Sequence, residues 1–204
     1  MAKVLREHTA SPRREHTVTP ERYARAELER LYREDCERHH DRKVEIINGR
    51  IVVRELPTSG HADIIYQLTI QLIPLLTKRG WKIWQDIKIF LHPQLDRYRP
   101  DITVVPPGPK MWDDENVWGN ETLLVVEVVS PSSVEDDHVT KPRNCALAGV
   151  PLYLVIDPFK RVTRLLSHPS QTGYRQRLEI PIGGLLELPA PWNFTIDTGT
   201  LIEE

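Results

Sequence analysis

Two isolated carboxylates are the residues of this chain whose types and positions could do chemistry. Glu127 interrupts the aliphatic run 123–129, whose β-branched residues predict a strand buried on both faces. Asp101 follows a proline and opens a second apolar stretch at 102–105. Burying an ionised carboxylate costs on the order of several kcal/mol unless a cation or hydrogen bonds offset the lost hydration. Two such acids on neighbouring strands would suit a hard divalent cation such as Mg²⁺ or Mn²⁺.

Each acid also has a structural interpretation. Asp101 could cap the start of its strand, and for this residue alone that is the better interpretation. Glu127 could pair with a buried Arg or Lys, but its position inside an aliphatic run favours a functional site. If the two strands pair with the acids adjacent, a cation bound there could orient and acidify a water molecule beside a phosphate group.

The composition of the chain argues against a strongly basic protein and against a membrane-spanning one. It has 204 residues, a net charge of -2 and a pI near 6.5, so it carries no overall basic footprint. Any binding of nucleic acid must therefore rest on a local patch or on bound metal. The two cysteines lack CxxC spacing, and no stretch has the length and apolarity of a membrane span. We therefore expect a cytoplasmic protein with no membrane partner.

The order of the expected elements indicates one α/β domain preceded by an arm. Residues 1–18 are polar and basic without periodicity, which predicts a flexible arm. The domain, residues 19–204, should begin with a helix that runs to about residue 40. Asn48-Gly49 between two β-branched runs is typical of a type I′ hairpin over 44–53. The elements expected next are a helix ending near Gly80, strands at 81–91 and 99–105, a loop at 106–120, the strand at 123–129, a short helix ending at Gly149, and strands at 151–157, 162–166 and 174–180.

Prolines and tryptophans modify these expectations. Pro74 lies inside a helical pattern and should kink or shorten the last turns of that helix. Pro142 disfavours the α conformation of Lys141, so the short helix should begin at Pro142 with Lys141 at its N-terminal edge. Trp112 and Trp118, if exposed on their loop, are candidates for a homodimer interface, although they could equally fold back onto the core.

Several short motifs, taken in their order and spacing, resemble the Uma-two family. This large bacterial family lies within the PD-(D/E)XK, or restriction-endonuclease-like, superfamily of nucleases. The similarity covers roughly residues 20–190 and no single motif is specific by itself. The segments that carry it are Glu45 with Asn48-Gly49, Ser59-Gly60-His61, Pro100-Asp101, Glu127-Val128-Val129-Ser130-Pro131-Ser132, Asp137, Lys141, Ala148-Gly149-Val150-Pro151 and Tyr153-Leu154-Val155-Ile156-Asp157-Pro158.

The resemblance implies a restriction-endonuclease-like three-layer fold, in which a central mixed β-sheet is flanked by helices. It also implies Mg²⁺-dependent phosphodiester hydrolysis, with Asp101 as the first metal ligand and Glu127 as the second. The superfamily's usual lysine, two residues after the second acid, is replaced by Val129. The family pattern moves that lysine to the following helix, where it corresponds to Lys141. Cys145 stands where the family has a tyrosine.

Three further residues have weaker assignments. His61 matches a family histidine at a helix start, where it could shuttle protons or bind phosphate, or could hydrogen-bond its own turn. Glu45 could join the acidic cluster, although an outward-facing strand glutamate is the simpler expectation. Asp137 precedes Lys141 by four residues and should orient that lysine rather than bind metal.

We therefore predict a metal-dependent endonuclease that hydrolyses phosphodiester bonds in DNA, with Mg²⁺ or Mn²⁺ as cofactor. The predicted catalytic residues are Asp101, Glu127, Lys141 and His61, and the first two are also the predicted metal ligands. Two alternatives stay open. One is a catalytically inactive module of the same fold that binds DNA or serves in an assembly, and the other is a metal-binding scaffold for a protein partner.

Overall fold

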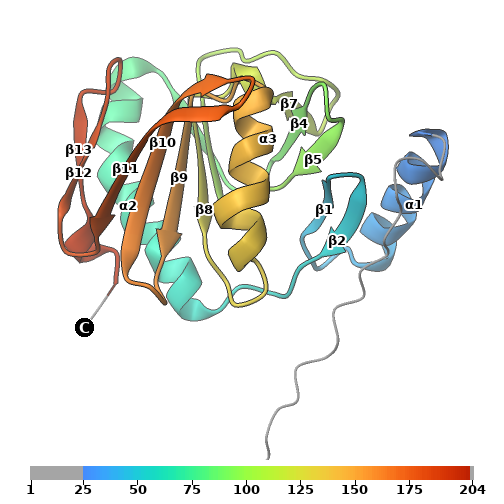
Figure 1. Cartoon of the computed structure of the whole chain (residues 1–204), viewed down its shortest axis with the longest axis horizontal. Helices are drawn as coiled ribbons and strands as arrows, with labels where there is room; N and C mark the ends of the chain where they lie inside the picture. Colours follow the sequence, from blue (N-terminus) through green and yellow to red (C-terminus); the bar gives the residue numbers. More distant parts are fainter. Residues whose placement is uncertain (1–24, 203–204) are drawn as a thin grey trace, which may run out of the picture.

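A six-stranded mixed sheet forms the centre of the computed structural model, which describes residues 25–202 (Figure 1). Its strands are β3 (Lys82–Trp84), β6 (Ile102–Val105), β8 (Leu124–Val128), β9 (Leu152–Asp157), β10 (Val162–Ser170) and β11 (Gly173–Pro181). They are ordered β11-β10-β9-β8-β6-β3. β8 and β9 run parallel, and the other neighbours run antiparallel. The predicted antiparallel pairing of the strands near 162–166 and 174–180 is confirmed by β10 and β11.

Helices cover both faces of this sheet. The long helix α2 (Ser59–Arg79) lies behind it in Figure 1, and α3 (Lys141–Leu147) lies in front. Successive residues of β8 point to opposite faces. Val126 accordingly shares a core with Leu68 of α2, whereas Val125 shares a second core with Cys145 of α3. The predicted three-layer architecture with a central mixed sheet is therefore confirmed.

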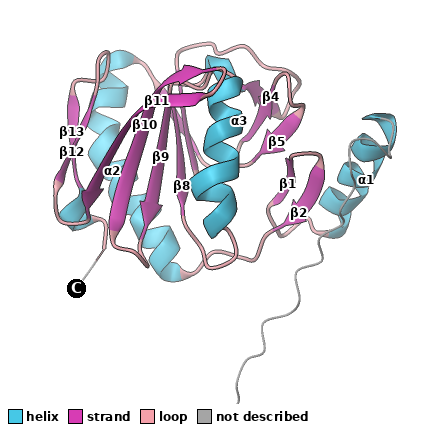
Figure 2. Cartoon of the chain, viewed as in Figure 1, coloured by secondary structure: helices cyan, strands magenta, loops and turns pink. Residues whose placement is uncertain are grey.

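A second sheet lies beside α3 and carries the predicted hairpin. Its strands are β1 (Val44–Ile47), β2 (Arg50–Val53), β4 (Lys88–Leu91), β5 (Asp96–Tyr98) and β7 (Asn116–Trp118), in the order β2-β1-β5-β4-β7. In Figure 2 the hairpin β1–β2 lies between α3 and the first described helix, α1 (Arg25–Arg38). Tyr32 of α1 packs with Ile46 and Ile51 of the hairpin. This packing fixes the hairpin, which supplies part of the site.

The remaining elements are short. A last hairpin of β12 (Leu185–Leu188) and β13 (Phe194–Asp197) adds Leu186 and Ile196 to the core on the α2 side of the central sheet. The helical turns outside α1, α2 and α3 are η1 (Gly119–Glu121), the π-helical η2 (Asp136–Thr140) and η3 (Thr198–Thr200). Within residues 25–202, no helix is both long and apolar enough to cross a membrane.

Local signals in the sequence are confirmed at turns. Asn48 and Gly49 have φ values of 50° and 69°, as a type I′ hairpin requires. α2 ends at Gly80 in the left-handed conformation, with φ 68°. The predicted shortening at Pro74 is wrong, because α2 continues through it to Arg79. The carbonyl that Pro74 leaves without a donor belongs to Ile70, which is 43% exposed, so water can replace the lost hydrogen bond.

Two expected segments are divided differently in the structure. The single strand expected at 81–91 is two strands, β3 and β4, which belong to different sheets and are separated by a break at Asp86 with φ 56°. The loop expected at 106–120 contains β7, which pairs in parallel with β4. The predicted arm and the first residues of the predicted N-terminal helix lie outside the described residues.

The tryptophans of the 106–120 segment fold back onto the protein. Trp112 stacks on Phe90 at a centroid distance of 4.3 Å, and Trp118 meets the same ring edge-on at 5.2 Å. Both are half-buried. Of the two alternatives for these tryptophans, the structure therefore shows the one in which they fold back onto the core, because the β4–β7 pairing turns them toward Phe90.

Lys141 has a helical backbone although Pro142 follows it. Its φ and ψ are -64° and -45°, and its N–H donates to the carbonyl of Asp136, five residues earlier. This wider π turn gives the ring of Pro142 room that an ordinary α turn would not leave. The expectation that helical structure begins only at Pro142 is wrong, because η2 leads into α3 without a break.

Candidate functional site

The strand register brings the two predicted acids together. β6 and β8 pair antiparallel with Ile102 opposite Val126, which places Asp101 and Glu127 side by side at the end of the ladder. Asp101 Oδ2 accepts a hydrogen bond of 2.8 Å from the backbone N–H of Val128. This bond fixes the carboxylate and leaves Oδ1 to face the site. The adjacency on which the predicted metal site depended is therefore present.

A lysine that sequence reasoning missed lies between the two acids. Lys43 Nζ donates to Asp101 Oδ1 at 2.7 Å and lies 3.9 Å from Glu127 Oε2. Lys43 directly precedes β1, two residues before the buried Glu45. Side chains two apart in an extended segment share a face, so the Lys43–Glu45 spacing could have revealed this residue.

Lys141 lies at the centre of three carboxylates. Its Nζ is 2.9 Å from Glu127 Oε1, 3.1 Å from Glu45 Oε1 and 3.2 Å from Asp137 Oδ1. The side chains of all four residues are at most 2% exposed. Glu45 is therefore an inward-facing member of the cluster, and the simpler expectation that it faces solvent is wrong, because Glu45 and Ile47 lie on the face of β1 that packs toward α3, whereas Val44 and Ile46 pack toward α1. Glu127 also has the buried lysine partner that its structural interpretation required.

Arg54 is a second residue that the sequence did not reveal. It follows β2, and its Nε lies 3.4 Å from Glu45 Oε2. Its Nη2 donates to Asp136 Oδ2 at 2.5 Å, and its Nη1 donates to the carbonyl of Ser132 at 3.0 Å. Arg54 thus ties the hairpin to the segment that leads into α3, and so helps to position Glu45 against Lys141.

His61 reaches the site from the first turn of α2. Its Nε2 lies 3.2 Å from Asp101 Oδ1, the same oxygen that Lys43 contacts. Thr58, the N-cap, accepts a hydrogen bond from the backbone N–H of His61 rather than from its ring. The ring is thus directed toward Asp101 and not toward its own turn.

Burial and charge act differently on the acids. Burial alone would raise the pKa of Glu45, but Lys141, Arg54 and Lys43 outweigh it and lower that pKa to about 2. Burial would also raise the pKa of Asp101, but the attraction of Lys43 and His61 is stronger and holds that pKa well below its usual value. At Glu127 burial prevails and raises the pKa to about 8, against the attraction of Lys141 and Lys43.

The pKa of Glu127 is raised although Lys141 contacts it, because Lys141 is shared among several acids. Burial would lower the pKa of Lys141, but three carboxylates share its ammonium and raise that pKa well above the usual value. The positive charge of Lys141 therefore offsets only part of the cost of burying each carboxylate. Lys43, the next nearest cation to Glu127, lies at 3.9 Å and is itself held by Asp101. Glu127 is thus the acid whose negative charge is least compensated.

These residues open onto a cleft of about 1180 Å³. The predicted residues that line it are Asp101, Glu127, Lys141, His61 and Asp137, whereas Glu45 lies behind them. The rim also carries three strongly exposed apolar side chains, Leu56, Tyr66 and Phe159, which are 61%, 60% and 64% exposed.

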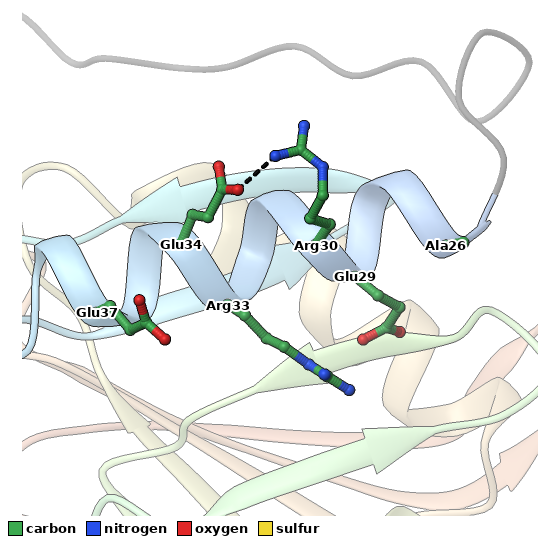
Figure 3. Close-up of a pocket in the computed structure, with 6 residues that line it drawn as sticks. All are labelled: Ala26, Glu29, Arg30, Arg33, Glu34 and Glu37. Atoms are coloured by element: carbon green, nitrogen blue, oxygen red, sulfur yellow. Dashed lines mark hydrogen bonds and ion pairs between the residues drawn. The ribbon is translucent and has the colours of Figure 1, made fainter.

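A second depression, of about 390 Å³, lies along α1 and has a different character (Figure 3). It is lined by charged side chains at helical spacing, and Arg30 pairs there with Glu27 and Glu34. Such exposed pairs on one helix contribute little free energy and mark a solvated face. This agrees with the charge pattern of the helix and indicates no chemical site.

The donor atoms of the cleft suit a hard cation. Within residues 25–202, no three side chains of the His, Cys, Asp and Glu types converge as a complete ligand set. Asp101 and Glu127 nevertheless present two carboxylates to one ammonium, that of Lys43, so a cationic group already stands between them. Oxygen donors of this kind fit Mg²⁺ or Mn²⁺, with water and phosphate oxygens as the other ligands.

Comparisons with known proteins agree with this geometry. A family model described as "Uma2: Putative restriction endonuclease" matches residues 25–198. A comparison with curated proteins gave no match. A crystal structure described as a putative nuclease belonging to DUF820, from Anabaena variabilis, is similar with a TM-score of 0.62 and 14% identity. The match covers 78% of this chain and 88% of that one, and it confirms the predicted restriction-endonuclease-like fold.

Proposed function

The chain belongs to the Uma2 family of restriction-endonuclease-like proteins, and on that premise we propose that it is a metal-dependent endonuclease that hydrolyses phosphodiester bonds in DNA. The observation that carries the proposal is the pair of carboxylates, Asp101 and Glu127, that flank the ammonium of Lys43 at the cleft. Glu127 also pairs with Lys141, but Glu45 and Asp137 share that ammonium. Two acids on adjacent strand ends, with the charge of Glu127 only partly compensated, favour a site built for a divalent charge.

We assign Asp101 and Glu127 as the residues that would hold Mg²⁺ or Mn²⁺. A divalent cation held there would supply Lewis acidity toward a phosphate oxygen and lower the pKa of a water molecule. The hydrogen bond from the N–H of Val128 keeps Asp101 in place, and the bond from Lys141 does the same for Glu127. The protein thus orients both acids before any ligand arrives.

Lys141 and His61 are the proposed partners of these acids. Lys141 lines the cleft but is held by Glu127, Glu45 and Asp137, so its ammonium has a fixed position from which to act on a developing negative charge. Asp137 then serves to orient Lys141, as its 3.2 Å contact allows. His61, beside Asp101, is placed to exchange a proton with the solvent of the cleft.

The walls of the cleft support a nucleic-acid substrate. Arg42, Lys43 and Arg99 line it, but seven acids also line it, so the lining as a whole is not positive. Contacts with phosphate groups would therefore rest on these individual cations and on bound metal. Tyr66 and Phe159 expose their rings on the same rim, where bases next to a bound phosphate could stack. We further propose that two copies of the chain pair when both strands of a duplex are cut, because residues 25–202 of one copy form one such site.

The test is a cleavage assay on purified protein with plasmid and oligonucleotide DNA. We expect cutting or nicking with Mg²⁺ or Mn²⁺, and its loss on chelation with EDTA or in Asp101→Asn. Glu115→Gln, which changes an acid with a 68% exposed side chain outside the cleft, is the matched control and should cleave normally. If Mn²⁺ binds at Asp101 and Glu127 but no DNA or RNA is cleaved, the catalytically inactive binding module replaces this proposal.

A further inference from the structure

We propose that Lys43 is a placeholder cation, whose ammonium occupies the metal position between Asp101 and Glu127 and is displaced into the cleft when a divalent cation enters. The inference rests on the proposed function, because it takes these two acids as the metal ligands. It assigns to Lys43 a role that its position before β1 did not reveal: it holds the site closed to solvent cations and then becomes available to a substrate phosphate.

Lys43 and Lys141 contact different carboxylate oxygens of Asp101 and Glu127. Lys141 contacts Glu127 through Oε1, at 2.9 Å. Lys43 lies toward the other oxygen, Oε2, at 3.9 Å, and contacts Asp101 Oδ1 at 2.7 Å. Asp101 Oδ2 is already occupied by the N–H of Val128. If this ammonium moved away, Glu127 Oε2 would be left for a metal ion, and Asp101 Oδ1 would keep only its contact with His61 Nε2 at 3.2 Å.

Lys43 has the freedom to move that Lys141 lacks. The side chain of Lys43 is 18% exposed and lines the cleft, whereas that of Lys141 is 2% exposed and contacts three carboxylates. An ammonium on a flexible four-carbon stem can leave one contact at little conformational cost. Lys43 has one close acidic contact, at 2.7 Å, and a longer one at 3.9 Å. Of the two lysines, Lys43 is therefore the one whose side chain can move out of the space between the two acids.

Electrostatic repulsion couples the entry of a divalent cation to the departure of the Lys43 ammonium. Two cations cannot share a space of a few ångströms between two acids without strong repulsion, so entry of a divalent ion and departure of the ammonium are coupled. Before metal binds, Lys43 partly neutralises Asp101 and Glu127 and keeps them from repelling each other. After departure its side chain lies in the cleft with His61 and Arg99 nearby on the lining, where a phosphate group can accept its hydrogen bonds.

The first test is calorimetric titration of the full chain with Mn²⁺, in the absence of DNA. Lys43→Met removes the competing charge and keeps the apolar stem, so we expect the Kd for Mn²⁺ to fall at least about tenfold. Lys88→Met is the matched control. Lys88 pairs with Glu115 at 2.6 Å and is 21% exposed, close to the 18% of Lys43, but it does not line the cleft. Its loss should leave the Kd within about twofold.

The second test separates displacement from simple repulsion and uses the unaltered protein. An amine-reactive acetylating reagent, read out by peptide mass spectrometry, should modify Lys43 slowly without metal and at least several-fold faster with saturating Mn²⁺, while Lys88 keeps its rate. An equal Kd in Lys43→Met, or an unchanged rate at Lys43 when Mn²⁺ is bound, overturns the placeholder role and leaves the nuclease proposal standing. If neither the unaltered chain nor Lys43→Met binds Mn²⁺, both proposals fail.

Discussion

The buried carboxylate of Glu127 gives a stability prediction that needs no substrate. Its pKa is raised to about 8 by burial, above its ordinary value of 4.5. An acid whose pKa is higher in the folded state than in the unfolded state costs stability as pH rises between those two values. Glu127→Gln replaces the carboxylate by a neutral group of the same size. The metal-free variant should therefore be more stable than the unaltered chain near pH 8, and similar to it near pH 5.

The size of the effect follows from the difference between the two pKa values of Glu127. The difference between 4.5 and about 8 corresponds to about 5 kcal/mol when Glu127 is fully ionised. This value already includes the attraction of Lys141 and Lys43, so the hydrogen bond from Lys141 is not subtracted again. Lys141 keeps Glu45 and Asp137 as partners in the variant, so it is not left unpaired. We expect a gain of up to about 5 kcal/mol, or up to about 10 to 20 °C in Tm for a domain of this size.

The assay is thermal unfolding in EDTA, followed by calorimetry or circular dichroism at several pH values from 5 to 8.5. The quantity of interest is the difference in Tm between Glu127→Gln and the unaltered chain, because groups that titrate in both proteins cancel. Glu115→Gln, at an acid with a 68% exposed side chain, serves as the control for loss of a carboxylate outside the cleft. Addition of Mn²⁺ at pH 8 should stabilise the unaltered chain more than Glu127→Gln, since only the former keeps both charged ligands.

Two results would refute this reasoning. A Tm difference that does not change with pH would mean that burial does not penalise the charge of Glu127. A variant that is less stable at pH 8 would mean that the ion pair with Lys141 stabilises the fold by more than the desolvation of Glu127 costs.

The remaining predictions concern activity, substrate and assembly. Lys141→Ala should leave Mn²⁺ binding nearly intact but slow DNA cleavage by at least about tenfold, and Lys141→Arg should restore only part of the rate; an unchanged rate in Lys141→Ala would remove this lysine from the mechanism. Tyr66→Ala and Phe159→Ala should each weaken binding of single-stranded DNA by about fivefold or more in fluorescence anisotropy, whereas Leu185→Ala, at an equally exposed position outside the cleft, should not. Light scattering at micromolar concentration should give the mass of a dimer when duplex DNA is bound, and a monomer on duplex DNA that is cut in both strands would contradict the proposed pairing.

The sequence by itself determined the local elements and the identity of the main acids. Asn48-Gly49 predicted the hairpin because positive φ values are a property of those two residues. Glu127 stood out because one carboxylate in a β-branched run is unusual wherever that run is placed. The order of motifs then connected Asp101, Glu127 and Lys141, which the structure brings together at one cleft.

Contacts between distant segments decided the rest. Lys43 and Arg54 look like ordinary polar residues at the ends of a hairpin, and only the packing of that hairpin against η2 and the end of β6 brings Asp136 to Arg54 and Asp101 to Lys43. The same packing buries Glu45, which a strand pattern alone would leave facing solvent. Propensity acts over a few residues, whereas strand register and burial depend on segments far apart in the chain, so tertiary structure alone could place a cation between the two acids.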